Sequence, residues 1–324
     1  MKPIRTLIAL TPLAWAAACH AADAYPSRPI TMVVAAPAGG ATDAVGRSIA
    51  DEMSKKLGQP VVIDNKPGAS SMLGTGTVAR AQPDGYTILM TLSSSIMNAQ
   101  YMYAKVPYDV KRDLAFVTQV ASASMVMAVN KDVPARNMKE FLAWAGQNKG
   151  KVSYGSFGVG TTGHLISAYL SNSRNLDMTH VAYKGEAPMI QDLIGGQIPW
   201  GIGSVGTLSP YLADGRLRAL AVAGDARMKD LPDVPTMAEA GLTGPEFKPT
   251  GWIVMMAPAQ TPAPILARIE KEARAAIQSP LVKARFQFYG LNAMGTSSEE
   301  FRRDYDATLP VIQRLITTAG VTVE

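Results

Sequence analysis

The chain has one cysteine, Cys19, and three histidines among its 324 residues. A single cysteine cannot form a disulfide within the chain, and so few cysteines and histidines also exclude a structural zinc site, so we expect no metal. Lys and Arg outnumber Asp and Glu by 31 to 26, but no block of like charges occurs. Because such a block is the usual electrostatic footprint of nucleic-acid binding, we expect no nucleic-acid partner.

The sequence also lacks an apolar run of the ~20 residues that a membrane-spanning helix needs. The apolar run at residues 7–18 is shorter, follows a basic start and ends before a group of small residues. This order predicts a secretory signal peptide at residues 1–24 that is cleaved after Ala24, so we expect the mature protein to be exported. Lipid attachment at Cys19 is the alternative, disfavoured because no bulky aliphatic residue stands three positions before it.

What the chain does have is the composition of folded domains, with 47% hydrophobic and 18% charged residues, and a length that favours two of them. Short apolar runs alternate with Gly-rich turns and amphipathic segments, which predicts an α/β protein with parallel sheets covered on both faces. The predicted strands are residues 30–36, 61–64, 86–92, 116–121, 125–130, 152–156, 179–182, 200–202, 217–223 and 251–257.

Predicted helices follow these strands, at 71–81, 188–194, 208–213, 263–278, 281–288 and 298–317. Further helices begin after Thr42 or Asp43 as the cap, after Asn137, and at Thr162. Thr296 and Glu299 form the expected capping box of the last helix.

Three of the turns between a strand and a helix have the composition of anion-binding loops, at residues 37–43, 65–71 and 155–164. Glycine allows backbone N–H groups to converge, and the positive end of a helix dipole favours a negative group there. A ligand carboxylate needs such donors, which nearby Ser and Thr hydroxyls can supplement. The simpler alternative is that these glycines only form tight turns.

Two enzymatic alternatives start from the same turn at 155–164. Gly158, Gly160 and Gly163 spell the dinucleotide fingerprint, but no acidic residue follows at the expected spacing, and export argues against a nicotinamide cofactor. We therefore expect no cofactor. Ser156 and His164 suggest a secreted serine hydrolase, but the nucleophile elbow requires glycine where Tyr154 stands.

The order of many short motifs along the chain resembles the Bug family, the extracytoplasmic solute receptors of tripartite tricarboxylate transporters. The segments that carry the resemblance are 25–30, 37–43, 57–62, 65–69, 79–86, 180–188, 192–197 and 231–236. The resemblance implies a two-lobed periplasmic binding protein of the flytrap, type II-like class, with the ligand cleft between the lobes. Lobe 1 would be discontinuous, with residues 25–124 plus 250–324, and lobe 2 would span 125–249.

The resemblance implies a receptor and not an enzyme. Its function would be to capture a small organic carboxylate, either a di- or tricarboxylate or an aromatic acid. The protein would be a monomer that delivers the ligand through transient contacts to the membrane subunits of a transporter. A purely sensory carboxylate receptor is the remaining alternative.

The ligand-binding residues that the resemblance implies come from the loops at the ends of the strands. They are Ala38, Gly39, Gly40, Ala41, Thr42, Asp43, Ser70, Ser93, Ser156, Phe157, Gly160, Thr161, Thr162, His164, Lys184, Gly203 and Ser204. Asp43 is also expected to hold the first loop in shape. Three positions depart from the family's usual residues: Ala36 where an aromatic is common, Phe157 where a small residue is usual, and Gly203-Ser204 where aspartate is common. These departures favour a larger or aromatic carboxylate over an amino acid.

Overall fold

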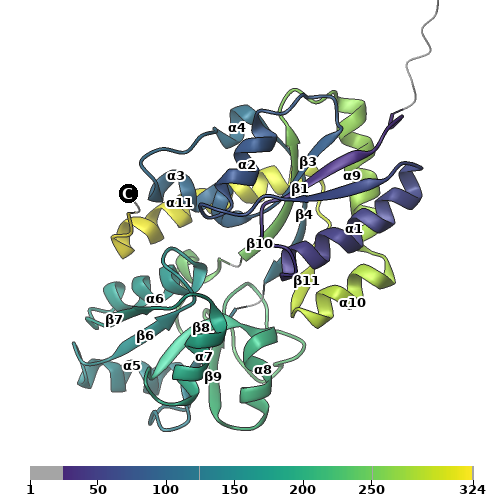
Figure 1. Ribbon diagram of the computed structural model, residues 1–324. Helices are drawn as coiled ribbons and strands as arrows, with labels where there is room; N and C mark the ends of the chain where they lie inside the picture. Colours follow the sequence, from purple (N-terminus) through teal and green to yellow (C-terminus); the bar gives the residue numbers. More distant parts are fainter. Residues whose placement is uncertain (1–24, 124, 250, 323–324) are drawn as a thin grey trace, which may run out of the picture.

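The structure, a computed structural model, describes residues 25–123, 125–249 and 251–322. The predicted signal peptide at 1–24 and Cys19 lie outside the described residues. The chain forms two α/β lobes, each built around one sheet (Figure 1). Within these described ranges, no helix combines the length and the apolar character needed to cross a membrane.

The first lobe contains a six-stranded sheet in the order β11-β4-β10-β3-β1-β2. Its strands are β1 (Ile30–Val34), β2 (Val61–Asn65), β3 (Thr87–Leu92), β4 (Leu114–Ala123), β10 (Gly251–Pro258) and β11 (Leu291–Ala293). Its helices are α1 (Ala41–Leu57), α2 (Met72–Ala79), the π-helix η1 (Ser94–Asn98), α3 (Ala99–Met102), α4 (Val110–Asp113), α9 (Ala263–Ile277), α10 (Pro280–Phe288) and α11 (Ser298–Ala319).

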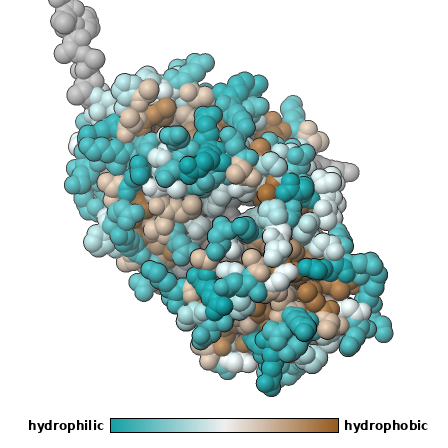
Figure 2. All heavy atoms as spheres, turned by 180° about the vertical axis from the view of Figure 1, so that it is seen from behind, coloured by the Kyte–Doolittle hydropathy of each residue, from teal (hydrophilic) through white to brown (hydrophobic). Residues whose placement is uncertain are grey.

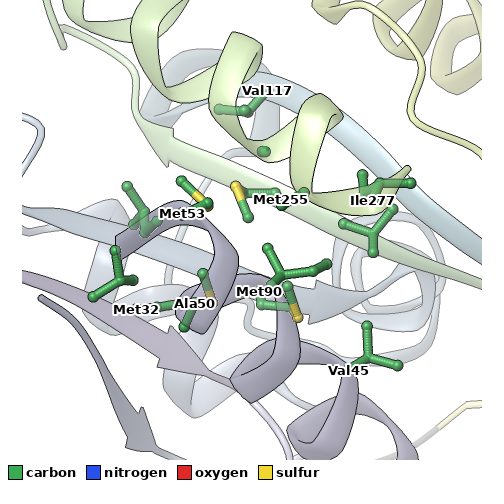
Figure 3. Packing of buried hydrophobic residues seen from close by; sticks show 14 of the residues in the cluster. Met32, Val45, Ala50, Met53, Met90, Val117, Met255 and Ile277 are labelled. Carbon is green, nitrogen blue, oxygen red and sulfur yellow. The ribbon is translucent and has the colours of Figure 1, made fainter. Parts of the chain in front are cut away.

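Alternation along the strands sends side chains into two separate cores. On β1, Met32 belongs to the layer beneath α1, α9 and α10, whereas Val33 belongs to the layer beneath α2, α3 and α11. Met53 of α1 and Met255 of β10 come together in the first layer with Met32 (Figure 3). Helices therefore cover both faces of the sheet, as the uniformly apolar strands predict.

The second lobe contains a five-stranded sheet in the order β7-β6-β8-β5-β9. Its strands are β5 (Met125–Asn130), β6 (Ser153–Ser156), β7 (Thr179–Ala182), β8 (Trp200–Ser204) and β9 (Leu217–Val222). Its helices are α5 (Met138–Gln147), α6 (Thr162–Ser173), α7 (Glu186–Ile194), α8 (Val205–Ala213) and the short 3₁₀ helix η2 (Pro245–Phe247). Side chains of α5 and α6 pack on one face of the sheet, and those of α7 and α8 pack on the other.

The expectation of wholly parallel sheets is wrong, because both sheets are mixed. β1, β2 and β3 are parallel, but β10 pairs antiparallel with both β3 and β4. In the second lobe β5 pairs antiparallel with β8 and β9. An apolar run shows that a strand is buried on both faces, but it carries no information on the direction of its neighbours.

The last helix begins at Ser298 as predicted, but its capping residue is one position later than predicted. Ser297 caps α11 and forms the capping box with Glu300. The hydroxyl of Thr296 instead accepts a hydrogen bond from the backbone N–H of Gln119, at 3.0 Å. Thr296 with Glu299 and Ser297 with Glu300 both have the spacing of a capping box. Ser297 forms the cap because the Thr296 hydroxyl is bonded to Gln119.

The two lobes contact each other at several places away from the connecting strands. The side-chain amide of Asn98 donates to the carbonyl oxygen of Gly160 at 2.9 Å. Arg314 of α11 pairs with the buried Glu246 of η2 at 2.7 Å. Seen from behind, hydrophilic residues cover most of both lobes (Figure 2).

Candidate functional site

Loops at the C-terminal edges of the two sheets face each other across the boundary between the lobes. β3 leads directly into η1, whose Asn98 contacts Gly160 in the loop after β6. β1 is a parallel neighbour of β3, and β8 is a parallel neighbour of β6. The loops after β1, β3, β6 and β8 therefore lie on the surfaces that the lobes turn toward each other, where open α/β sheets bind ligands.

Asp43 fixes the loop that follows β1. Its carboxylate accepts hydrogen bonds from the N–H of Gly39 at 2.9 Å, from Asn65 at 2.9 Å and from Arg47 at 3.0 Å. Burial alone would raise the pKa of Asp43, but these donors outweigh it and hold the pKa below its ordinary value. Asp43 is 3% exposed, so it shapes the loop and its oxygens are occupied. The cap of α1 is Gly40, not Thr42 or Asp43 as predicted.

The first turn of α1 presents unpaired donors. Gly40 caps the helix without any side-chain hydrogen bond, and the N–H groups of Gly40, Ala41 and Thr42 have no acceptor within the described ranges. The Thr42 hydroxyl is likewise without a partner there, although Thr42 is buried. Ala38, Gly39 and Gly40 are exposed. This combination of free N–H groups, a hydroxyl and a helix dipole suits an anion.

In the loop after β6, the side chains of Ser156 and His164 are both occupied. The Ser156 hydroxyl lies 2.7 Å from Nε2 of His180 and donates to the carbonyl of Gly158 at 3.0 Å. Nδ1 of His164 accepts from the N–H of Gly160 at 3.0 Å. Ser156 is fully buried and His164 is 5% exposed. The hydrogen bonds of the Ser156 hydroxyl and of Nδ1 of His164 therefore shape the loop from within.

The histidine rings form a buried stack. His164 and His180 lie parallel with ring centroids 3.7 Å apart, and Tyr154 stacks on His180 at 5.1 Å. Burial, assisted by the neighbouring His180, lowers the pKa of His164 to about 4, and burial also lowers the pKa of His180. Both rings are therefore neutral at pH 7.

The remaining residues of this loop begin the next helix or contact neighbouring parts of the protein. The hydroxyl of Thr161 caps α6 by accepting from the N–H of His164. Thr162, the first residue of α6, is half-buried and its hydroxyl has no partner in the described part of the chain. Phe157 is half-buried and packs on the core of the second lobe. Gly160 has φ +73° and lies against the side chain of Met102 in the first lobe.

The loops after β7 and β8 meet through a residue that the sequence analysis did not select. The Glu186 carboxylate accepts from the N–H of Ser204 at 2.7 Å, from the Ser204 hydroxyl at 2.6 Å and from the Thr207 hydroxyl at 2.7 Å. Gly203 is buried beneath it, with space for a Cβ limited by Leu208 and Met189. Lys184 is exposed and makes no ion pair with any described residue.

The two serines predicted in the first lobe have separate partners. The hydroxyl of Ser70 lies 2.7 Å from that of Tyr103. Ser70 sits in a left-handed stretch in which Ala69, Ser70 and Ser71 all have positive φ, a conformation that costs a non-glycine residue roughly 1 kcal/mol or more. The Ser93 hydroxyl accepts from the N–H of Trp252 at 3.1 Å, at the start of β10. Ser93 thus ties η1 to a connecting strand.

Sequence reasoning missed Glu186, His180 and Asn98 as organisers of these loops. Their partners Ser204, Ser156 and Gly160 lie 18, 24 and 62 residues away along the chain. No local pattern connects such pairs. One signal was available for Glu186: it directly follows Gly185 at the start of a helix, where acidic side chains are favoured by the helix dipole.

A cleft of about 1070 Å³ lies between the lobes at a different place. Residues 224–230 with Pro245, Lys248 and Pro249 line it from the second lobe, and α10, β11 and α11 line it from the first. None of the predicted ligand-binding residues lines this cleft.

The loop after β6 does not form a hydrolytic site. The Ser156 hydroxyl contacts His180 instead of His164, and the serine has no exposed surface at which a substrate carbonyl could reach it. The described residues also contain no group of three or more His, Cys, Asp or Glu able to hold a metal ion. The arrangement favours binding through backbone and hydroxyl donors.

Comparisons with known proteins agree with the two-lobed fold. Residues 45–321 match the profile of the family described as tripartite tricarboxylate transporter family receptor. A UPF0065 protein from the tcbD-tcbE intergenic region of Pseudomonas sp. (strain P51) is 39% identical over 278 residues, which is 86% of this chain and 82% of that protein.

Two solved structures cover almost the whole chain. An R. palustris protein determined with adipate is 30% identical, with a TM-score of 0.76, and the match covers 92% of this chain and 99% of that one. MatC from Rhodopseudomonas palustris with bound malate is 27% identical, with a TM-score of 0.73, and the match covers 90% of this chain and 100% of that one.

Proposed function

Because this chain belongs to the tripartite tricarboxylate transporter family of receptors, we propose that it captures a small organic carboxylate between its two lobes and delivers it to the membrane subunits of such a transporter. Receptors of this family are periplasmic solute-binding proteins and not enzymes. In this proposal the mature chain works in the periplasm as a monomer, after removal of residues 1–24.

The observation that carries the proposal is the open first turn of α1. The N–H groups of Gly40, Ala41 and Thr42 and the Thr42 hydroxyl are unpaired within the described ranges, while Asp43 holds the loop rigid through Gly39. A preorganised set of donors at a helix N-terminus binds a carboxylate without the cost of ordering the loop first.

The loop after β6 supplies the matching surface on the other lobe. Thr162 offers a free hydroxyl at the first turn of α6, and Gly160 already contacts the first lobe through Asn98. The structures of similar proteins determined with adipate and with malate support a carboxylate as the ligand. The proposed ligands are di- or tricarboxylates and aromatic acids.

The proposed mechanism is a population shift between open and closed arrangements of the lobes. A ligand that contacts both lobes stabilises the closed form, and the membrane partner binds that form. The chain crosses between the two sheets where β4 leads into β5 and again just before β10. We propose hinges at 122–125 and 250–253, of which residues 124 and 250 lie outside the described ranges, with lobe 1 at 25–124 plus 250–324 and lobe 2 at 125–249.

Titration calorimetry tests the proposal with four groups of ligands: citrate-like acids, dicarboxylic acids, aromatic acids and amino acids. We expect saturable 1:1 binding of at least one carboxylic acid, and we expect Thr42→Val to weaken it. Thr179→Val is the matched control, since Thr179 is an exposed strand residue of the second lobe. Absence of binding by every acid to a folded protein would refute the proposal.

A further inference from the structure

The second-lobe surface of the proposed site contains a carboxylate of the protein itself. Glu186, half-buried at the start of α7, bonds through both oxygens to donors at the start of α8. Oε1 accepts from the backbone N–H of Ser204 and Oε2 accepts from the hydroxyls of Ser204 and Thr207, all between 2.6 and 2.7 Å. These are three short charge-assisted hydrogen bonds to one anion.

This carboxylate lies on the surface that faces the first lobe. In the loop after β6, the strand between β7 and β8, Gly160 contacts Asn98 and Met102 of the first lobe. Between Ser204 and Thr207, the two residues that bond to Glu186, Gly206 of α8 approaches the backbone of Gly290 so closely that a Cβ on Gly206 would lie 3.1 Å from the Gly290 Cα. Ser204 is partly exposed and Thr207 is exposed, so the space next to Glu186 is open to solute.

The helix starts of the proposed site differ in what occupies them. α1 is capped by Gly40 without any side-chain hydrogen bond, whereas at the start of α8 Glu186 accepts from the backbone N–H and the hydroxyl of the N-cap residue Ser204. The site therefore offers free donors on the first lobe and a fixed negative charge on the second. A ligand that binds α1 through one carboxylate and reaches the start of α8 with a second would place that second charge beside the carboxylate of Glu186.

We propose that Glu186 is a specificity-determining residue of the site and narrows the set of proposed ligands: the receptor selects a monocarboxylate, such as an aromatic acid, whose far end is uncharged or donates a hydrogen bond, over the matched dicarboxylate. This inference rests on the proposed function, because it assumes that the first carboxylate binds at α1. Oε1 accepts only one hydrogen bond from the described residues, so it has capacity for a hydroxyl or amide donor of the ligand. Lys184, in the same loop, is exposed, and its ammonium has no ion-pair partner in the described ranges. Its positive charge would favour a second carboxylate and so would oppose the selection by Glu186.

Matched acids with one skeleton and either one or two carboxylates test the inference directly. The pairs are hexanoate with adipate and benzoate with terephthalate, titrated by calorimetry into the wild type and three variants. Glu186→Ala frees the donors of Ser204 and Thr207, and Glu186→Gln keeps the shape without the charge. Glu299→Ala removes an exposed charge on α11 as the control.

We expect the wild type and Glu299→Ala to bind the monocarboxylate of the better pair at least tenfold more tightly than its dicarboxylate. Glu186→Ala should reduce that ratio at least tenfold, and Glu186→Gln should give an intermediate ratio, which keeps the test valid if the alanine variant does not fold. A wild-type preference for the dicarboxylate, or a ratio that is unchanged in both Glu186 variants, overturns the inference while leaving carboxylate capture intact. If no acid binds the wild type, both proposals fail.

Discussion

Acidification should destabilise the second lobe through its stacked histidines. His164 and His180 lie 3.7 Å apart, both buried or half-buried, and neither has a carboxylate partner within the described ranges. Protonation of His164 would place a charge in the buried stack beside His180. It would also disrupt the bond from the Gly160 N–H, because a protonated Nδ1 cannot accept it.

The sign and size of the effect follow from the pKa of His164. Its value is about 4 in the folded chain against 6.5 for an unperturbed histidine, so the unfolded chain binds more protons between these two pH values. The stability contributed by neutral His164 is complete above pH 6.5 and is lost as the pH falls toward 4. The difference corresponds to at most about 3 kcal/mol, and the lowered pKa of His180 acts in the same direction.

Urea unfolding at pH 7, 5.5 and 4 measures this loss, with His164→Asn as the matched variant. The Asn side-chain oxygen can accept from the Gly160 N–H but does not titrate in this range. We expect the free energy of unfolding of the wild type to fall by up to about 3 kcal/mol from pH 7 to pH 4, and that of the variant to fall clearly less. Parallel pH profiles for the two proteins would refute the reasoning.

Three further predictions concern the proposed ligand site. Thr42→Val and Thr162→Val should each weaken carboxylate binding by about 1–3 kcal/mol in calorimetry, and unchanged affinity would remove that hydroxyl from the site. Asp43→Asn should lower the free energy of unfolding by about 1–3 kcal/mol, because its bonds to Gly39 and Asn65 lose the charge; equal urea midpoints would contradict this. Gly160→Ala, which places a Cβ against Met102 at a φ of +73°, should separate the lobes and increase the radius of gyration in small-angle scattering. Identical scattering profiles would show that the loop adapts.

Local sequence signals predicted most elements because they depend on short-range chemistry. The apolar run at β5 (Met125–Asn130) and the stop of α1 at Gly58, which has φ +70°, are visible from composition alone. The direction of a strand cannot be predicted from composition. β10 is antiparallel to its neighbours because of how the chain returns from the second lobe. The short strand β11 was missed for the same reason, because it exists through its pairing with β4.

The candidate site was also predictable only in part. Glycine-rich turns mark where the backbone can present N–H groups, so the loops at 38–43 and 156–164 could be selected from sequence. Which polar groups remain free could not be predicted. Asp43, Ser156 and His164 are occupied by partners within the protein, whereas Thr42 and Thr162 are not. That distinction depends on distant residues such as Asn65 and His180, which only the folded chain brings together.

A crystal structure of the protein with its tightest-binding carboxylic acid tests the central claim most directly. We predict a carboxylate within hydrogen-bonding distance of the N–H groups of Gly40, Ala41 and Thr42, with the rest of the ligand contacting the loop at 156–164. A ligand bound instead in the cleft of about 1070 Å³ beside α10 and α11, with the first turn of α1 left open, would contradict it.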